Sequence, residues 1–176
     1  MRALLTASLV FGLATAAMAQ TVDLKVGDQA PLPGPIAERI ARFHMIDNTR
    51  GEPPLWGRDD VRSRQMNLTV QEATETSIVL RLEGTVLLST RPDVDKAERG
   101  YDARLLGTIG YDRKKAGITR FDVVALGEHW GEGTYTRNAR PGRSALGVAF
   151  ELAKGDSATD LVPPQGSREL NVYFGK

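Results

Sequence analysis

The sequence predicts a mainly β protein: one domain built from a strongly curved antiparallel sheet or a small β-barrel, with one N-terminal α-helix packed on it. In residues 101–130, apolar side chains recur at every second position in two long runs joined by a turn at 112–117. This is the pattern of a β-hairpin. Similar runs at 66–71, 78–88 and 145–152 are joined by short connections, which favours antiparallel neighbours.

The hairpin at residues 101–130 is expected to lie at the centre of the sheet. Its second run is apolar on both sides, because Val124 and Leu126 alternate with the other apolar positions, and such a strand belongs inside a sheet. Glycines within the long runs favour strong bending. In the first run the apolar face is expected to hold Tyr101, Ala103, Leu105, Gly107, Ile109 and Tyr111, with the other face wet. In the second run Phe121, Val123 and Ala125 are expected on one face and Val124 and Leu126 on the other.

A short helix is expected to begin at Pro35, where the missing N–H of proline costs nothing. Its buried stripe is formed by apolar residues spaced at helical intervals, and Glu38 and Arg42 are expected to pair on the solvent side. The helix should end near residues 47–51, which contain an asparagine and a glycine. Residues 170–174 are interpreted as a short edge strand.

Three segments are expected along the chain. Residues 1–19 have the charged start, apolar stretch and small-residue cleavage site of a secretory signal peptide, with cleavage after Ala19. Residues 20–34 are an extended leader, and residues 35–176 form the single β domain. The predicted location is therefore periplasmic or extracellular, without a transmembrane segment once the signal has been removed.

Charge and composition exclude several classes of protein. Arg2 is the only charged residue of the signal segment, so the remaining chain has 22 basic and 22 acidic residues and is formally neutral. A neutral chain is not expected to bind nucleic acid, which requires a basic excess. The sequence contains no cysteine, so the stability of an exported product must come from its core.

The most suggestive stretch for chemistry is Gly-Glu-His-Trp-Gly-Glu-Gly at residues 127–133. His129 titrates near neutrality, so it could act as a general acid or base oriented by Glu128 or Glu132. The alternative is structural: Trp130 is a core or rim aromatic, the glycines are bends, and His129 bonds a nearby carbonyl group. A single short motif does not decide between the two.

His44 and Asp47 are the second candidate pair, three residues apart at the end of the expected helix. They could form a proton-shuttling pair or half of a metal site. Alternatively, His44 borders the apolar stripe and Asp47 satisfies the helix end. The two histidines, His44 and His129, could converge if the helix lies over the end of the hairpin. No metal and no cofactor are predicted, because no ligand spacing or binding motif is present.

Arginines form the only local charge bias, in one loop at residues 48–64 around Trp56 and in another at 137–143. Guanidinium groups suit carboxylates and phosphates, so an anionic ligand is one interpretation, and a solvated surface paired with nearby acids is the other. The residues considered for ligand binding are Trp130, Trp56, Arg50, Arg137 and Arg140.

These observations favour an exported bacterial binding or interaction module for a small apolar or anionic ligand, or for an envelope partner. One alternative is a periplasmic enzyme that uses His129 with Glu128, Glu132 or Asp47. A structural envelope protein is another. The enzyme requires His129 in a cleft within reach of a carboxylate, whereas the binding module requires a hollow interior.

Overall fold

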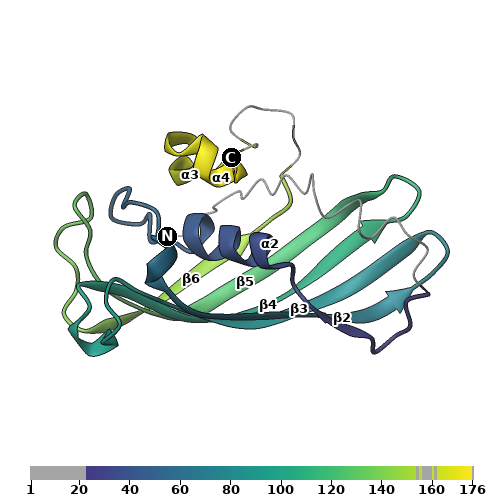
Figure 1. Cartoon of the computed structure of the whole chain (residues 1–176), viewed down its shortest axis with the longest axis horizontal. Coiled ribbons are helices and arrows are strands. Elements are labelled where there is room, and N and C mark those ends of the chain that lie inside the picture. The colour runs from purple at the N-terminus through teal and green to yellow at the C-terminus, as the bar shows by residue number, and fades with distance from the viewer. Residues whose placement is uncertain (1–22, 154, 156–159, 161, 176) are drawn as a thin grey trace.

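The computed structural model describes residues 23–153, 155, 160 and 162–175. Within them, a single antiparallel sheet has its strands in chain order, so that each strand pairs with the next (Figure 1). The strands are β1 (Gln29–Pro31), β2 (Val61–Ala73), β3 (Ser77–Ser89), β4 (Arg99–Asp112), β5 (Gly117–Gly131) and β6 (Arg143–Phe150). The predicted class, mainly β with antiparallel neighbours, is confirmed.

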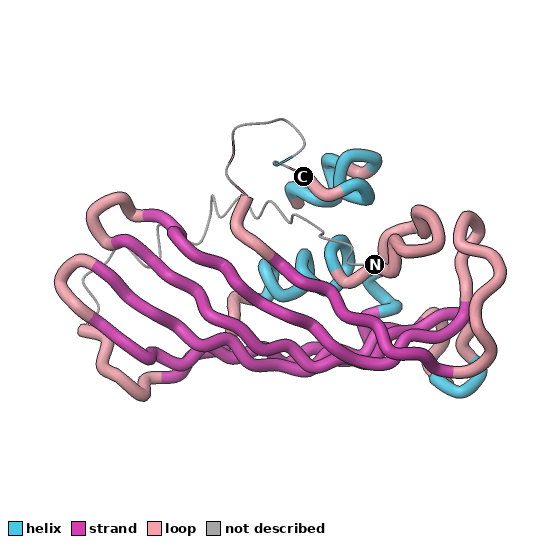
Figure 2. The backbone as a smooth tube through the Cα atoms, turned by 180° about the vertical axis from the view of Figure 1, so that it is seen from behind, coloured by secondary structure: helices cyan, strands magenta, loops and turns pink. Residues whose placement is uncertain are grey.

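The sheet is open, so the small β-barrel, one of the two predicted forms, is wrong. The order β1-β2-β3-β4-β5-β6 leaves β1 and β6 as the two edges, and in Figure 2 the strands run side by side without closing. Closure would require β6 to pair with a long strand at the opposite edge. The strand there, β1, is three residues long, ends in Pro31, and faces β2 only at residues 67–69.

The predicted central hairpin is β4 and β5, paired in a register that places Tyr101 opposite His129 and Leu105 opposite Ala125. The side chains expected inside the sheet are buried on one face, where they form the core. The opposite face of β5 is wet: Val124 is 49% exposed and Leu126 is 60% exposed. β5 is thus internal because it pairs on both sides, while one of its faces meets solvent.

The helical segment near the N-terminus lies over the inner face of the sheet (Figure 1). It consists of α2 (Gly34–Arg39) and a wider π-helical stretch, η1 (Ile40–His44). Glu38 and Arg42 pair at 3.1 Å, as predicted. The prediction that the pair lies on the solvent side is wrong for Arg42, which is buried. The reason is that the following loop folds back over the helix, where Arg42 Nε donates to the carbonyl oxygen of Trp56 at 2.8 Å.

Two short helices lie near the C-terminus, α3 (Pro164–Arg168) and α4 (Leu170–Phe174), and α4 packs against η1. The edge strand predicted at residues 170–174 is therefore wrong. Tyr173 is buried with its ring edge-on to that of Phe43, at a centroid distance of 5.1 Å, and this contact favours a helix over a strand. Single 3-10 turns lie at Arg58–Asp60 (η2) and Val94–Lys96 (η3).

Two predictions concern the start of the chain. The signal segment, residues 1–19, lies outside the described residues. The described part of the leader includes β1, so the leader joins the sheet. None of the helices in the described part of the chain is both long enough and apolar enough to cross a membrane.

Candidate functional site

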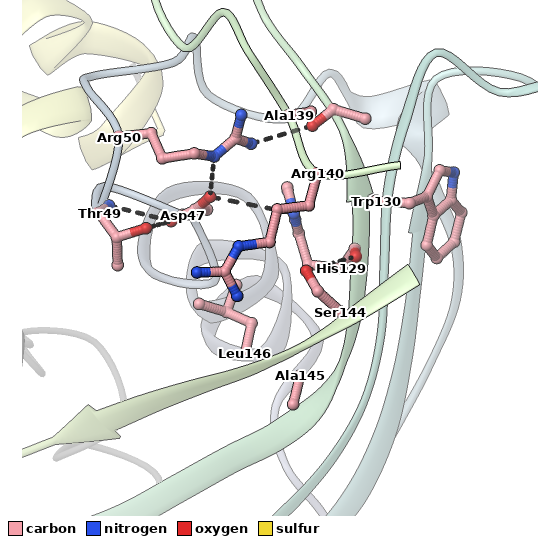
Figure 3. A pocket seen from close by; sticks show the side chains of 11 residues that line it. Asp47, Thr49, Arg50, His129, Trp130, Ala139, Arg140, Ser144, Ala145 and Leu146 are labelled. Carbon is pink, nitrogen blue, oxygen red and sulfur yellow. Dashed lines mark hydrogen bonds and ion pairs between the residues drawn. The ribbon is translucent and has the colours of Figure 1, made fainter. Parts of the chain in front are cut away.

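A polar cleft lies where the end of β5 meets the start of β6 (Figure 3). Its volume is about 190 Å³. Four parts of the chain form it: the segment after η1, the end of β5, the loop that leads into β6, and the first half of β6. The lining residues are Asp47, Thr49, Arg50, His129, Trp130, Gly131, Ala139, Arg140, Ser144, Ala145 and Leu146.

Asp47 is held in place by its own segment. The helical conformation ends at Met45, and two residues later the Asp47 carboxylate accepts hydrogen bonds from the backbone N–H and the hydroxyl of Thr49. An aspartate that bonds the backbone two residues further on closes a local turn. The same hydrogen bonds fix the direction of the carboxylate in the cleft.

Arg50 fastens this turn to the loop after β5. Its Nε donates to Asp47 Oδ2 at 3.2 Å, and its other two nitrogens donate to the carbonyl oxygens of Thr136 at 2.9 Å and Gly131 at 3.0 Å. Since all three nitrogens bond to the protein, Arg50 is a clamp between segments that are distant in sequence.

His129 lies on the inner face of β5, 6% exposed, with its Nδ1 3.9 Å from Asp47 Oδ2. Burial lowers the pKa of His129, and the charges of Arg50 and Arg99 act in the same direction, against the opposing effect of Asp47. Burial raises the pKa of Asp47, but the hydrogen bonds from Thr49, the electrostatic effect of His129 and the hydrogen bond from Arg50 outweigh this and hold that pKa below its ordinary value. At neutral pH the site therefore holds an ionised carboxylate beside a neutral imidazole.

Of the three carboxylates considered as partners of His129, the structure brings Asp47 to it. Glu128 points to the opposite face of β5, because neighbouring residues of a strand alternate, and it lies 3.7 Å from Arg143. Glu132 is exposed and accepts a hydrogen bond from the backbone of Ala139 at 3.1 Å, which holds the loop.

Neither tryptophan directs its ring at the Asp47 carboxylate. The Trp130 indole points away from the Asp47 and His129 side chains in Figure 3, and Arg143 stacks over it at 4.3 Å from the ring centroid. Trp56 is a core residue, not a lining residue. Its Nε1 donates to the carbonyl oxygen of Met45 at 2.8 Å, and Arg99 stacks on its ring at 3.9 Å.

Arg140 and Arg137 are both exposed residues of the loop between β5 and β6, but only Arg140 lines the cleft. Neither guanidinium has a hydrogen bond or ion pair within the described part of the chain. Sequence reasoning missed Ser144, which also lines the cleft. It stands opposite His129 in the register of β5 and β6, a signal that becomes readable only when the pairing is known.

The predicted pair of His44 and Asp47 is not formed by the contacts of the described structure. His44 lies among aromatic side chains, whereas Asp47 lies beside Arg50 and His129. The His44 Nε2 is 3.3 Å from the Tyr173 hydroxyl, and its ring lies beside that of Phe150. Burial, aided by the charge of Arg39, lowers the pKa of His44 to about 3. Among the described residues, no group of three or more His, Asp or Glu side chains could hold a metal ion.

The low pKa of His44 predicts that acid destabilises the fold. Because the unfolded chain takes up this proton near pH 6.5 and the folded chain only near about 3, stability should fall as the pH drops through that interval. Urea unfolding of the wild type and of His44→Gln, measured between pH 7 and pH 4, tests this. The variant should lose much of the slope, whereas His129→Gln should retain the part due to His44. An unchanged slope in His44→Gln would contradict the prediction.

Two smaller pockets lie elsewhere in the described structure. One, of about 100 Å³, is lined by Arg39, Arg42 and Arg58 together with Tyr173. The other, of about 90 Å³, is apolar, and its lining includes Leu68 and Leu80. The apolar pocket is well below the ~300 Å³ at which sites for drug-sized ligands begin. Comparison of the chain with protein-family models, curated proteins and solved structures found no match.

Proposed function

We propose that this chain is an exported binding module, acting in the periplasm or outside the cell, that holds a small anionic ligand in the cleft between β5 and β6. The observation that carries the proposal is Arg140, a guanidinium that lines the cleft without a partner among the described residues. An apolar ligand is less well supported because the apolar pocket has only about 90 Å³.

The charges around the cleft favour an anion. Asp47 and Arg50 pair with each other, and the lowered pKa of His129 leaves its imidazole neutral at neutral pH. Among the charged side chains that line the cleft, Arg140 is therefore the one without an oppositely charged partner in the described part of the chain. Its planar fork matches a carboxylate or a phosphate. The Ser144 hydroxyl also lines the cleft, where it donates to the carbonyl oxygen of His129 at 3.4 Å.

Isothermal titration with acetate and with inorganic phosphate tests this proposal. Arg140→Gln should weaken binding by about tenfold or more, because a charge-assisted hydrogen bond contributes ~1.5 to 3 kcal/mol. Arg137→Gln is the matched control: it removes the same charge from the same exposed loop, away from the cleft, and affinity should change by less than about twofold. Equal losses in both variants, or no binding of either anion by the wild type, would refute the proposal.

A second candidate function is an enzyme in which His129 is the general base and Asp47 orients it. The approach of Asp47 Oδ2 to His129 Nδ1 favours this candidate. It ranks below binding because 3.9 Å exceeds the ~3.2 Å limit of a hydrogen bond and because His129 is buried. If the bound compound is recovered unchanged, binding alone is supported, whereas conversion to a product favours catalysis. The third alternative, a structural envelope protein, requires neither binding of a small compound nor its conversion.

A further inference from the structure

The two edges of the sheet differ in how they are protected. Strand edges expose backbone groups that can pair with another chain, and proteins commonly block them with proline, lysine or very short strands. At one edge β1 is short and ends in Pro31. At the other edge β6 is eight residues long and contains neither proline nor lysine. Within the described residues, β6 pairs with β5 alone.

The anion cleft lies along the first half of this unprotected edge. Three consecutive residues of β6, Ser144, Ala145 and Leu146, line the cleft, and Arg140 precedes the strand by three residues. A chain that paired with β6 would therefore pass the cleft and come close to the Arg140 guanidinium. The open edge of β6 and the unpartnered guanidinium of Arg140 therefore form one continuous surface.

We propose that the ligand is an extended peptide that adds antiparallel to β6, with its C-terminal carboxylate bound by Arg140. This inference rests on the proposed function and names the class of anion. Antiparallel pairing directs the C-terminal end of the peptide to the start of β6, where Arg140 lies. Parallel pairing would bring a terminal amino group there, against a cation. Main-chain hydrogen bonds supply affinity in this mode of recognition, and the carboxylate fixes the register.

The outer face of β6 indicates which peptide side chains fit. Ala145, Gly147 and Ala149 are small and exposed, and the neighbouring Leu126 is 60% exposed. Bulky β-branched side chains at alternate positions of the peptide would pack beside these small residues, as cross-strand pairs do. We expect a preference for valine or isoleucine at the positions that face this side.

Fluorescence anisotropy with a labelled hexapeptide of alternating threonine and valine, carrying a free C-terminal carboxylate, tests the inference. Amidation of that carboxylate should weaken binding to the wild type by about tenfold and should have little further effect in Arg140→Gln. Two further peptides carry N-methyl groups on alternate residues. A strand donates to one neighbour at every second residue. Binding should therefore be abolished only for the peptide in which the methyl groups replace the N–H hydrogens that would face β6.

Several outcomes would overturn this inference, and they can be told apart from failure of the proposed function. If acetate binds and the peptide binds no more tightly than acetate, the anion site is supported but the peptide is rejected as its ligand. Equal binding of the acid and the amide, or of both N-methyl sets, also overturns it. Light scattering could show that the protein is a dimer. If the peptide does not dissociate this dimer, the partner of β6 is a second copy of the chain and not a peptide. If neither acetate nor the peptide binds, both proposals fail.

Discussion

Replacing Trp56 with alanine is expected to lower the free energy of unfolding by about 3 to 5 kcal/mol, the range for loss of a large buried aromatic. Its side chain is 1% exposed. Its Nε1 bonds the Met45 carbonyl oxygen, and the Arg99 guanidinium lies over its ring. The alanine variant therefore loses apolar burial, a hydrogen bond and a stacking partner at once. Urea unfolding at neutral pH measures the effect.

Trp56→Phe separates these contributions. Phenylalanine keeps an aromatic surface for Arg99 but cannot donate to Met45, so the loss should be intermediate, with about 1 to 3 kcal/mol from the unpaired carbonyl group. Val26→Ala, at a side chain 69% exposed, is the surface control and should stay within about 0.5 kcal/mol of the wild type. A loss below about 1 kcal/mol in Trp56→Ala would show that this ring is not a core residue.

Gly131→Ala is expected to destabilise the protein by about 3 kcal/mol or more, because two independent costs add. Gly131 has a φ of +76°, a conformation that alanine rarely adopts, and an added Cβ would overlap the backbone carbonyl oxygen of Glu98. The same residue offers its carbonyl oxygen to Arg50. Its displacement should therefore also weaken the clamp beside the cleft. Unfolding and anion titration of this variant measure both effects.

Gly147→Ala is the matched control for that substitution. Gly147 lies in β6, and the nearest described atom to an added Cβ is Leu126 Cδ1 at 3.7 Å, an ordinary contact. Stability should change by less than about 1 kcal/mol. Similar losses in the two glycine variants would contradict the assignment of a backbone clash to Gly131 alone.

The predicted site was only partly recoverable from the sequence. His129 and Arg140 were separate candidates from the sequence, one for acid–base chemistry and one for ligand binding, and both line the cleft; Asp47 was considered as a partner of His129. The choice of Asp47 over Glu128 depended on which face of β5 each side chain occupies and on where the helix ends. Ser144 could not be recognised before the register of β5 and β6 was known.

Local patterns specified the individual elements: the period-2 alternation of residues 101–130 indicated the hairpin and the buried face of its first strand, because each strand must hide one side of its pleat. The open sheet, the helix at residues 170–174 and the approach of Asp47 to His129 came from the packed fold. These features depend on contacts between segments far apart in the chain. Such contacts override local preference and leave no periodic trace in the sequence.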